Sequence, residues 1–278
     1  MTSAYSVLMP LAPWEQPAIV AEALRSLCHQ PLPPAQVVIS CDGTPPHRLR
    51  AVLNEAPLNT EILCGPGGEG VGPVLARGLK ACATELVIRA DADDISLPER
   101  CTRQVSFALA NPQLAAISSA IAEFHSDPRQ PDAIRQVPLS TEAIRRQCRW
   151  RNPLNHPAVL LRRSAVMTVG NYRHCPGFED YDLWLRLLKA GYHLQNIADP
   201  LVLCRTGASH LARRRGWMYC RREAAFFWRC GQEGLLPWSS VMVNLTTRLP
   251  LRVLPAWLLQ FVMVSWLRRA IQKNLDVA

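Results

Sequence analysis

Short apolar runs alternate with segments of helical periodicity along most of the chain. Strand-like runs occur at 6–10, 36–41 and 85–90, and helical patterns at 17–29 and 74–83 fall between them. This β-α-β order predicts an α/β fold with a largely parallel sheet and helices on its faces. Residues 114–124 have the pattern of a further strand.

The clearest helical pattern covers residues 178–192. Its apolar face contains Tyr181, Trp184, Leu185 and Leu188. Asp182 stands four residues before Arg186, which predicts an ion pair along the helix, and Gly191 is expected to end it. A second helix is expected after residue 94, beginning at a capping box of Ser96 and Glu99.

The composition is that of a folded protein. The chain has 278 residues, 49% of them hydrophobic, which suffices for one large α/β domain with an appendage and excludes disorder. The ten cysteines occur singly and without C-x-x-C spacing, so we expect reduced core residues, not disulfides or zinc ligands. The first residues do not have the basic and apolar regions of a signal peptide, which predicts a cytoplasmic protein.

Three aspartates in four positions follow the strand-like run at 85–90. Because ligands bind beyond the carboxyl ends of parallel strands, Asp91, Asp93 and Asp94 stand where chemistry is expected. Residues two apart on an extended chain point the same way, so Asp91 and Asp93 can converge on a divalent cation that neutralises nucleotide phosphates. The alternative is an ordinary acidic turn before a helix.

Other motifs carry weaker signals. Asp42 also follows a strand, although Asp-Gly there is typical of a plain turn. The glycine-rich segment 65–72 lacks both the Walker ending and a strict G-x-G-x-x-G. Glu179 and Asp180 begin the amphipathic helix, a rigid place for a general base or simply an acidic helix start. His156, between Asn155 and Pro157, is either functional or structural.

Taken together, these segments resemble the family 2 glycosyltransferases with the GT-A fold. The match is ordered and covers roughly residues 5–215, with its motifs at 6–10, 37–43, 89–96, 98–100, Gln104, 152–157 and 177–184. It is closest to bacterial enzymes of exopolysaccharide, capsule and lipopolysaccharide assembly. The resemblance implies a GT-A domain at 1–215 and a helical extension at 216–278.

The resemblance also implies roles for particular residues. Asp91 and Asp93 would form the D-x-D motif that holds the ribose and an Mn²⁺ or Mg²⁺ ion, and Asp180, assisted by Glu179, would be the base of an inverting transfer. The remaining candidates are Pro10, Asp42 and Arg77 for the nucleotide sugar, His156 and Trp184 for the acceptor, and His210 as a further metal ligand.

The positive charge is confined to the end of the chain. Residues 1–204 hold 19 basic and 19 acidic side chains, whereas 205–278 hold 12 and 3, which accounts for the whole net charge of +9. Residues 254–267 carry no formal charge, include Trp257 and Trp266, and are too short to span a bilayer. We expect this segment to lie at a membrane surface. The alternative is a helix packed on the catalytic domain.

These observations predict a peripheral enzyme on the inner face of the plasma membrane. It would move a sugar from a nucleoside-diphosphate donor to a saccharide or polyprenyl-linked acceptor in bacterial cell-surface polysaccharide synthesis. A nucleic-acid-binding protein is disfavoured because the basic residues flank an apolar segment and no recognition motif is present. A non-catalytic, membrane-associated assembly subunit with a degenerate nucleotide site is the alternative, and a nucleotidyltransferase is less well supported.

Overall fold

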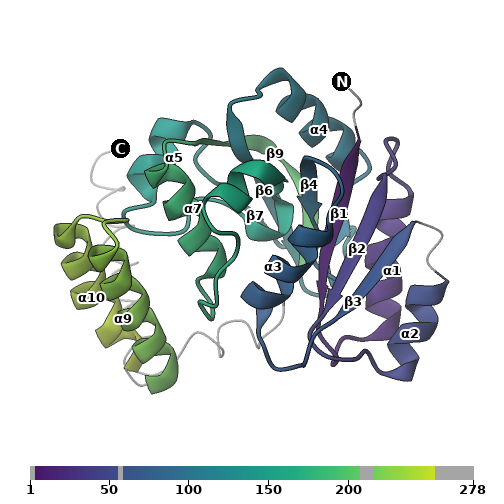
Figure 1. Ribbon diagram of the computed structural model, residues 1–278, viewed down its shortest axis with the longest axis horizontal. Helices are drawn as coiled ribbons and strands as arrows, with labels where there is room; N and C mark the ends of the chain where they lie inside the picture. Colours follow the sequence, from purple (N-terminus) through teal and green to yellow (C-terminus); the bar gives the residue numbers. More distant parts are fainter. Residues whose placement is uncertain (1–3, 56–58, 207–215, 254–278) are drawn as a thin grey trace. The chain divides into compact units, whose positions relative to one another are not determined.

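The computed structural model describes residues 4–55, 59–206 and 216–253. The chain divides into two compact units, Met1–Gly207 and Ala208–Ala278. The domain boundary expected after residue 215 falls next to residues 207–215, which lie outside the described residues. Figure 1 shows the elements of both units.

The first unit is built on a mixed sheet with the order β3-β2-β1-β4-β8-β6-β9-β5, with β7 paired to β6. The strands are β1 (Tyr5–Leu11), β2 (Gln36–Cys41), β3 (Thr60–Cys64), β4 (Leu86–Arg89), β5 (Ile95–Ser96), β6 (Leu114–Phe124), β7 (Ala133–Arg135), β8 (Leu160–Arg162) and β9 (His193–Arg205). Strands β3, β2, β1 and β4 run parallel, as predicted. Strand β8 lies antiparallel between β4 and β6, so the sheet is less uniform than the β-α-β order indicated.

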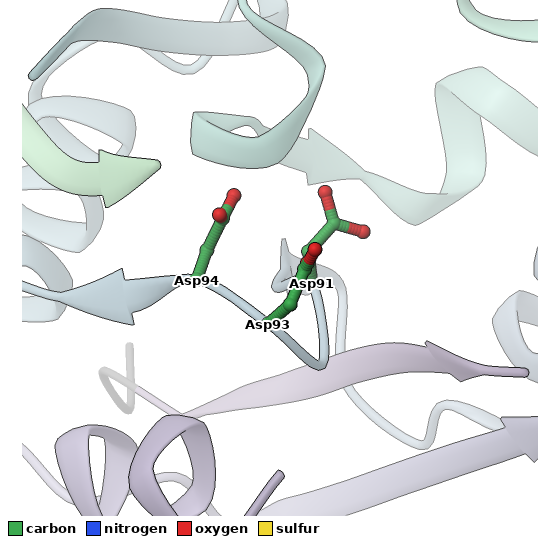
Figure 2. A group of neighbouring side chains, drawn as sticks. All are labelled: Asp91, Asp93 and Asp94. Carbon is green, nitrogen blue, oxygen red and sulfur yellow. The ribbon is translucent and has the colours of Figure 1, made fainter. Parts of the chain in front are cut away.

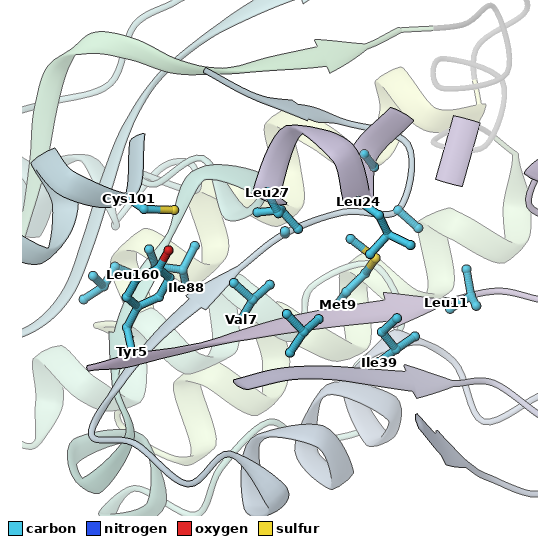
Figure 3. Close-up of a cluster of buried hydrophobic side chains, with 14 of the residues drawn as sticks. Tyr5, Val7, Met9, Leu11, Leu24, Leu27, Ile39, Ile88, Cys101 and Leu160 are labelled. Atoms are coloured by element: carbon cyan, nitrogen blue, oxygen red, sulfur yellow. The ribbon is translucent and has the colours of Figure 1, made fainter. Parts of the chain in front are cut away.

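Helices pack on both faces of this sheet (Figure 1). They are α1 (Pro17–Cys28), α2 (His47–Asn54), α3 (Val71–Ala81), α4 (Arg100–Ala110), α5 (Thr141–Gln147), α6 (Arg163–Thr168) and α7 (Glu179–Lys189), with one 3₁₀ turn at His156–Ala158. Figure 3 shows alternate β1 side chains, from Tyr5 to Leu11, packed with Leu24 and Leu27 of α1 and Cys101 of α4. On the opposite face α3 lies against β1. The two elements are in close contact, since a Cβ added to Gly78 would come within 2.3 Å of Leu8 Cδ1.

The capping box expected at Ser96 is wrong. Ser96 belongs to β5 and pairs with Val202 of β9, and α4 begins only at Arg100. The Ser96 hydroxyl accepts a hydrogen bond from Arg100 Nη1 at 3.0 Å and caps no backbone amide. Pairing with a distant strand therefore outweighs the local capping signal.

Helix α7 confirms its predicted features. Arg186 Nε donates to Asp182 Oδ2 at 2.8 Å, and Gly191 takes a φ of +87° where the chain leaves the helix. The Arg186 guanidinium also donates to the backbone oxygens of Val169 and Asn171. The helix is nevertheless buried beyond one stripe, since every residue from Tyr181 to Leu188 is buried.

The prediction that the cysteines are core residues is confirmed for eight of the ten, which are buried, whereas Cys28 is half-buried and Cys64 is exposed.

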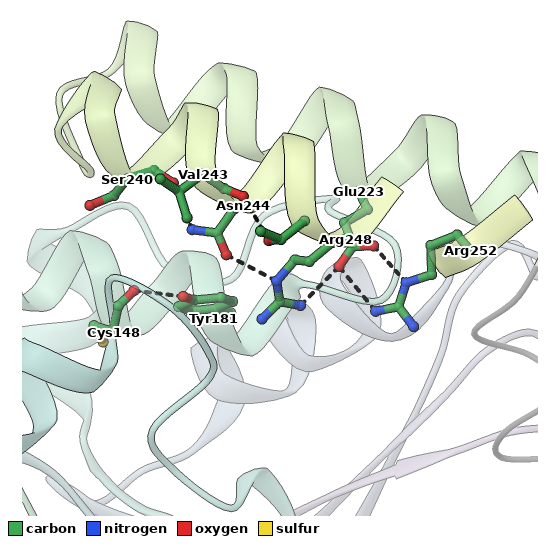
Figure 4. A network of polar contacts seen from close by, with 9 residues as sticks. Cys148, Tyr181, Glu223, Ser240, Val243, Asn244, Arg248 and Arg252 are labelled. Atoms are coloured by element: carbon green, nitrogen blue, oxygen red, sulfur yellow. Dashed lines mark hydrogen bonds and ion pairs between the residues drawn. The ribbon is translucent and has the colours of Figure 1, made fainter. Parts of the chain in front are cut away.

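The second unit contains α9 (Trp217–Gln232) and α10 (Trp238–Val253). Glu223 of α9 has no exposed surface and accepts hydrogen bonds from Arg248 and Arg252 of α10 (Figure 4). A buried carboxylate is thus neutralised by two cations, which fixes one helix against the other. Across the described parts of the chain, the helices fall short of the length and apolarity that crossing a bilayer would require.

The buried Asp182–Arg186 pair generates a stability prediction. Replacing Asp182 with Ala leaves a guanidinium buried without its carboxylate, so we expect the unfolding free energy to fall by about 3 kcal/mol or more in urea titrations. The control is Asp199→Ala, which breaks the exposed pair with Arg103 and should cost less than about 1 kcal/mol. Equal losses in the two variants would contradict the assignment.

Candidate active site at the carboxyl edge of the sheet

Three parallel strands end at one edge of the sheet and place polar residues there. Pro10 of β1 pairs with Ser40 of β2, and Asp42 follows β2 with its amide donating to Leu11 O. Asp91 begins the turn that follows β4, the neighbour of β1 on its other side. The parallel order therefore brings Pro10, Asp42 and Asp91 to the same edge, as the sequence predicts.

The three aspartates after β4 form a carboxylate cluster. Oxygens of Asp91, Asp93 and Asp94 lie within 4.8 Å of one another, and Figure 2 shows the side chains rising from one turn toward the same side. Burial, followed by the charges of the other two, raises the pKa of Asp94 to about 7. Burial and the Asp91 charge also raise the pKa of Asp93. A bound cation would relieve this repulsion.

The donor set fits a hard divalent cation. Carboxylate oxygens are the ligands that Mg²⁺ and Mn²⁺ prefer, and Asp91 and Asp93 are only half-buried. Asp94 is already engaged, since it accepts hydrogen bonds from the Arg205 amide at 2.9 Å and from Cys204 Sγ at 3.1 Å. Asp94 thus anchors the turn to β9, and Asp91 and Asp93 are the more accessible ligands because they are less buried than Asp94.

Arg89, the last residue of β4, is a buried cation that the sequence reasoning did not select. It is 5% exposed and forms a two-pronged ion pair with Asp91. Burial raises the pKa values of Asp93 in the first acidic group and of Glu179 and Asp180 in the second, and the Arg89 charge acts against this rise in all three. One guanidinium thus stabilises both groups of carboxylates. The signal in the sequence was a charged residue closing an otherwise apolar strand.

Two buried polar residues of α4 form hydrogen bonds with the backbone at this edge of the sheet. Arg100 is 1% exposed and donates to Arg89 O and, at 3.0 Å, to Pro157 O. Gln104 donates to Ala158 O at 2.7 Å. The end of β4 and the His-Pro segment are therefore fixed to one helix, which gives a structural reason for the pattern at 98–100 and Gln104.

The second acidic pair begins α7. Asp180 Oδ1 accepts from the Tyr181 amide at 2.7 Å, and Oδ2 accepts from Asn152 Nδ2 at 2.5 Å. Burial raises the pKa of Asp180, and the Asn152 hydrogen bond acts in the opposite direction. Burial and the Asp180 charge raise the pKa of Glu179 to about 7. Burial therefore makes the Asp180 carboxylate a stronger proton acceptor than an exposed aspartate.

Of the two acceptor candidates, Trp184 is fully buried, whereas His156 is half-buried. Trp184 has no exposed surface, so it cannot contact an acceptor directly. The helical pattern predicted one apolar face, whereas α7 is buried on several faces. His156 packs edge-on to Trp184 and lies with Nε2 3.0 Å from Tyr172 Oη. Burial and the Arg89 charge lower its pKa well below the ordinary value, so the imidazole is neutral. Trp184 thus packs against His156, and His156 contacts Tyr172.

The nucleotide candidates form one connected group. Asp42 Oδ1 accepts from the Glu69 amide at 3.0 Å. Arg77 donates to Glu69 Oε2 and to Cys41 O, each at 2.7 Å, and the pair crosses Gly65 so closely that a Cβ there would meet Arg77 at 2.5 Å. The Arg77 charge is therefore partly neutralised by Glu69. His210 lies outside the described residues.

Comparison with known proteins gives consistent results. The family model for glycosyl transferase family 2 matches residues 7–170. The amylovoran biosynthesis glycosyltransferase AmsE of Erwinia amylovora is 33% identical over 225 residues, covering 80% of this chain and 84% of that protein. The Escherichia coli UDP-Gal:alpha-D-GlcNAc-diphosphoundecaprenol beta-1,3-galactosyltransferase is 31% identical over 270 residues, covering 96% and 98%.

Solved structures show the same fold at low sequence identity. S. aureus TarS 1-349 in complex with UDP-GlcNAc gives a TM-score of 0.62 at 16% identity, covering 82% of this chain and 66% of that TarS fragment. The mannosyltransferase PcManGT of Pyrobaculum calidifontis, in complex with GDP-Man and Mn²⁺, also gives 0.62 at 16% identity, covering 96% and 75%.

The raised pKa of Glu179 predicts how stability depends on pH. The folded protein binds this proton more tightly than the unfolded chain, so the unfolding free energy of metal-free protein should fall as pH rises from about 4.5 to about 7. In Glu179→Gln we expect this loss to be smaller by roughly 2 kcal/mol, measured by urea unfolding in chelator at several pH values. Exposed Glu99→Gln serves as the control. A parental slope in Glu179→Gln would refute the assignment.

Proposed function

From the premise that this chain belongs to glycosyl transferase family 2 and has the GT-A fold, we propose that it moves a sugar from a nucleoside-diphosphate donor to a lipid-linked saccharide in bacterial surface polysaccharide synthesis. One observation carries the proposal. The two acidic groups that such a transfer needs, at 91–94 and 179–180, both interact electrostatically with the buried guanidinium of Arg89. The lipid-linked acceptor follows from the name of the Escherichia coli relative.

The donor binds at the carboxyl edge of the sheet. Asp42, directly after β2, and Arg77 of α3 contact the nucleoside, with Pro10 at the same edge of the sheet. Asp91 and Asp93 would hold a divalent cation at this edge. When bound, this cation supplies positive charge that neutralises the departing diphosphate.

Asp180 acts as the general base. The acceptor hydroxyl oxygen attacks the anomeric carbon, its proton passes to the Asp180 carboxylate, and the bond between that carbon and the diphosphate oxygen breaks. A single in-line displacement inverts the anomeric configuration and releases the nucleoside diphosphate without a covalent enzyme intermediate. Glu179, whose Oε2 accepts from the Gly177 amide at 2.8 Å, helps to shape the acceptor side. A non-catalytic subunit has no need for two intact acidic groups in this arrangement.

Two variants should separate donor binding from transfer. Asp93→Ala removes a metal ligand, so calorimetry with UDP, GDP, CDP and ADP should lose any Mn²⁺-dependent binding that the parent shows. Asp180→Asn should bind the same nucleotide within about twofold but transfer sugar about 10²- to 10⁴-fold more slowly, because only the base is removed. Normal turnover in Asp93→Ala would exclude the metal role, and retained transfer in Asp180→Asn would assign the base elsewhere.

The basic extension, residues 216–278, is the membrane-binding part of this proposal, and 1–215 is the catalytic domain. Trp217, Trp228 and Trp238 are exposed, and so are Arg221 and Arg222. Aromatic rings suit the headgroup region and the arginines suit anionic lipid. This arrangement would hold the enzyme at the inner face of the plasma membrane, where a lipid-linked acceptor is found.

Charge removal tests the membrane assignment. In Arg221→Gln/Arg222→Gln we expect partitioning onto phosphatidylglycerol-containing vesicles to weaken tenfold or more, because each arginine near an anionic surface contributes about 1 kcal/mol. The control removes two exposed arginines from the first unit, Arg25→Gln/Arg48→Gln, and should change binding little. Vesicle binding by the full-length protein that is equal in both double variants would reject this surface.

A further inference from the structure

The segment that carries the Asn-His-Pro motif brings an amide to the catalytic carboxylate. Asn152 Nδ2 donates to Asp180 Oδ2 at 2.5 Å, across 28 residues of sequence. On its other side Asn152 Oδ1 accepts from the Leu154 amide at 3.3 Å. These two contacts orient the side-chain amide, because a rotated amide would set its oxygen against the Asp180 carboxylate and its NH2 group against the Leu154 N–H.

The segment itself is held in place from several directions. The amide of Asn196 donates to Pro153 O at 3.1 Å, and the amide of Asn155 donates to Ser119 O at 2.8 Å. Arg135 Nε in turn donates to Asn155 Oδ1 at 2.7 Å. Asn152 therefore extends from a backbone fixed to β6 and β9, and its hydrogen bond to Asp180 is preorganised.

The chemistry of the pair is asymmetric. An amide nitrogen can only donate, so it stabilises the ionised form of Asp180, whereas burial favours the protonated form. The other titratable groups facing Asp180 are Glu179 beside it on α7, Tyr172 and, from β4, Arg89. Asn152 is the side-chain donor to Asp180 and, like the Tyr181 backbone amide, it does not titrate, so its ability to donate does not change with pH.

We propose that Asn152 is the positioning residue of this enzyme: it orients Asp180 toward the acceptor hydroxyl and keeps that carboxylate ionised. The inference deepens the proposed function and rests on Asp180 as the base. It assigns a role to the first residue of the 152–157 segment, which the sequence singled out only as part of a pattern.

The test is a direct titration of Asp180. Protein labelled with ¹³C at the aspartate carboxyl carbons is titrated by NMR in chelator, and the Asp180 signal is identified by its loss in Asp180→Asn. In Asn152→Ala we expect the Asp180 midpoint to rise by about one to two pH units, the effect of losing a hydrogen bond to a charged group. Asn152→Leu, which retains most of the side-chain volume, should show the same rise if the alanine variant folds poorly.

A control and a second readout separate this role from a merely structural one. Asn111→Ala loses a side-chain hydrogen bond to Phe107 O at the end of α4 and should leave the Asp180 midpoint unchanged. The transfer rate of the Asn152 variants should recover toward the parental value at high pH, with nucleotide affinity within twofold. An unshifted midpoint in folded Asn152 variants, or a loss of rate that is the same at every pH, would overturn the proposal.

The two proposals fail in different ways. If Asp180→Asn retains transfer, the general base is misassigned, although the titration would still report whether Asn152 controls Asp180. If Asp180→Asn is inactive and the midpoint does not move in the Asn152 variants, the base stands and the positioning role is lost.

Discussion

A single buried guanidinium, Arg89, is the constraint on which the site depends. Its ion pair with Asp91 anchors the first acidic group, and its charge also acts on Asp93, Glu179 and Asp180. A buried cation is costly unless it is paired, and the surrounding carboxylates more than satisfy it. Burial, followed by the charges of neighbouring carboxylates, raises the pKa values of Asp93, Asp94 and Glu179. In the proposed function, the binding of a cation and the basicity of the second acidic pair would both depend on this buried charge balance.

The sheet order delivers these groups to one place. The antiparallel strand β8 enters between β4 and β6, so the 3₁₀ turn before it lies at the end of β4, where the Arg89 amide donates to Val159 O. Arg100 and Gln104 then bind the backbone of the same turn from α4. Because these two buried side chains bind backbone oxygens of separate segments, the edge is rigid before any ligand arrives.

The two units of the chain divide the physical tasks. The first unit carries a neutral charge balance overall and concentrates its acidic groups at the sheet edge, whereas the second concentrates basic and aromatic residues on two helices. Within the second unit Glu223 is neutralised by Arg248 and Arg252, so the remaining arginines of α9 set its surface charge.

Strands, helices and the acidic residues at strand ends are predictable from the amino-acid sequence of this protein. Hydrophobic periodicity identified the parallel strands and α7, and the acidic residues at the ends of β2 and β4 were predictable because parallel strands share one ligand-binding edge. Tertiary structure decided which polar groups meet: Arg89 between the acidic groups, Asn152 on Asp180, Ser96 in β5 in place of a helix cap, and Trp184 beneath the site. These pairings join residues far apart in the chain. Local patterns fix where a segment turns and which side is apolar, whereas sheet order and packing fix its neighbours.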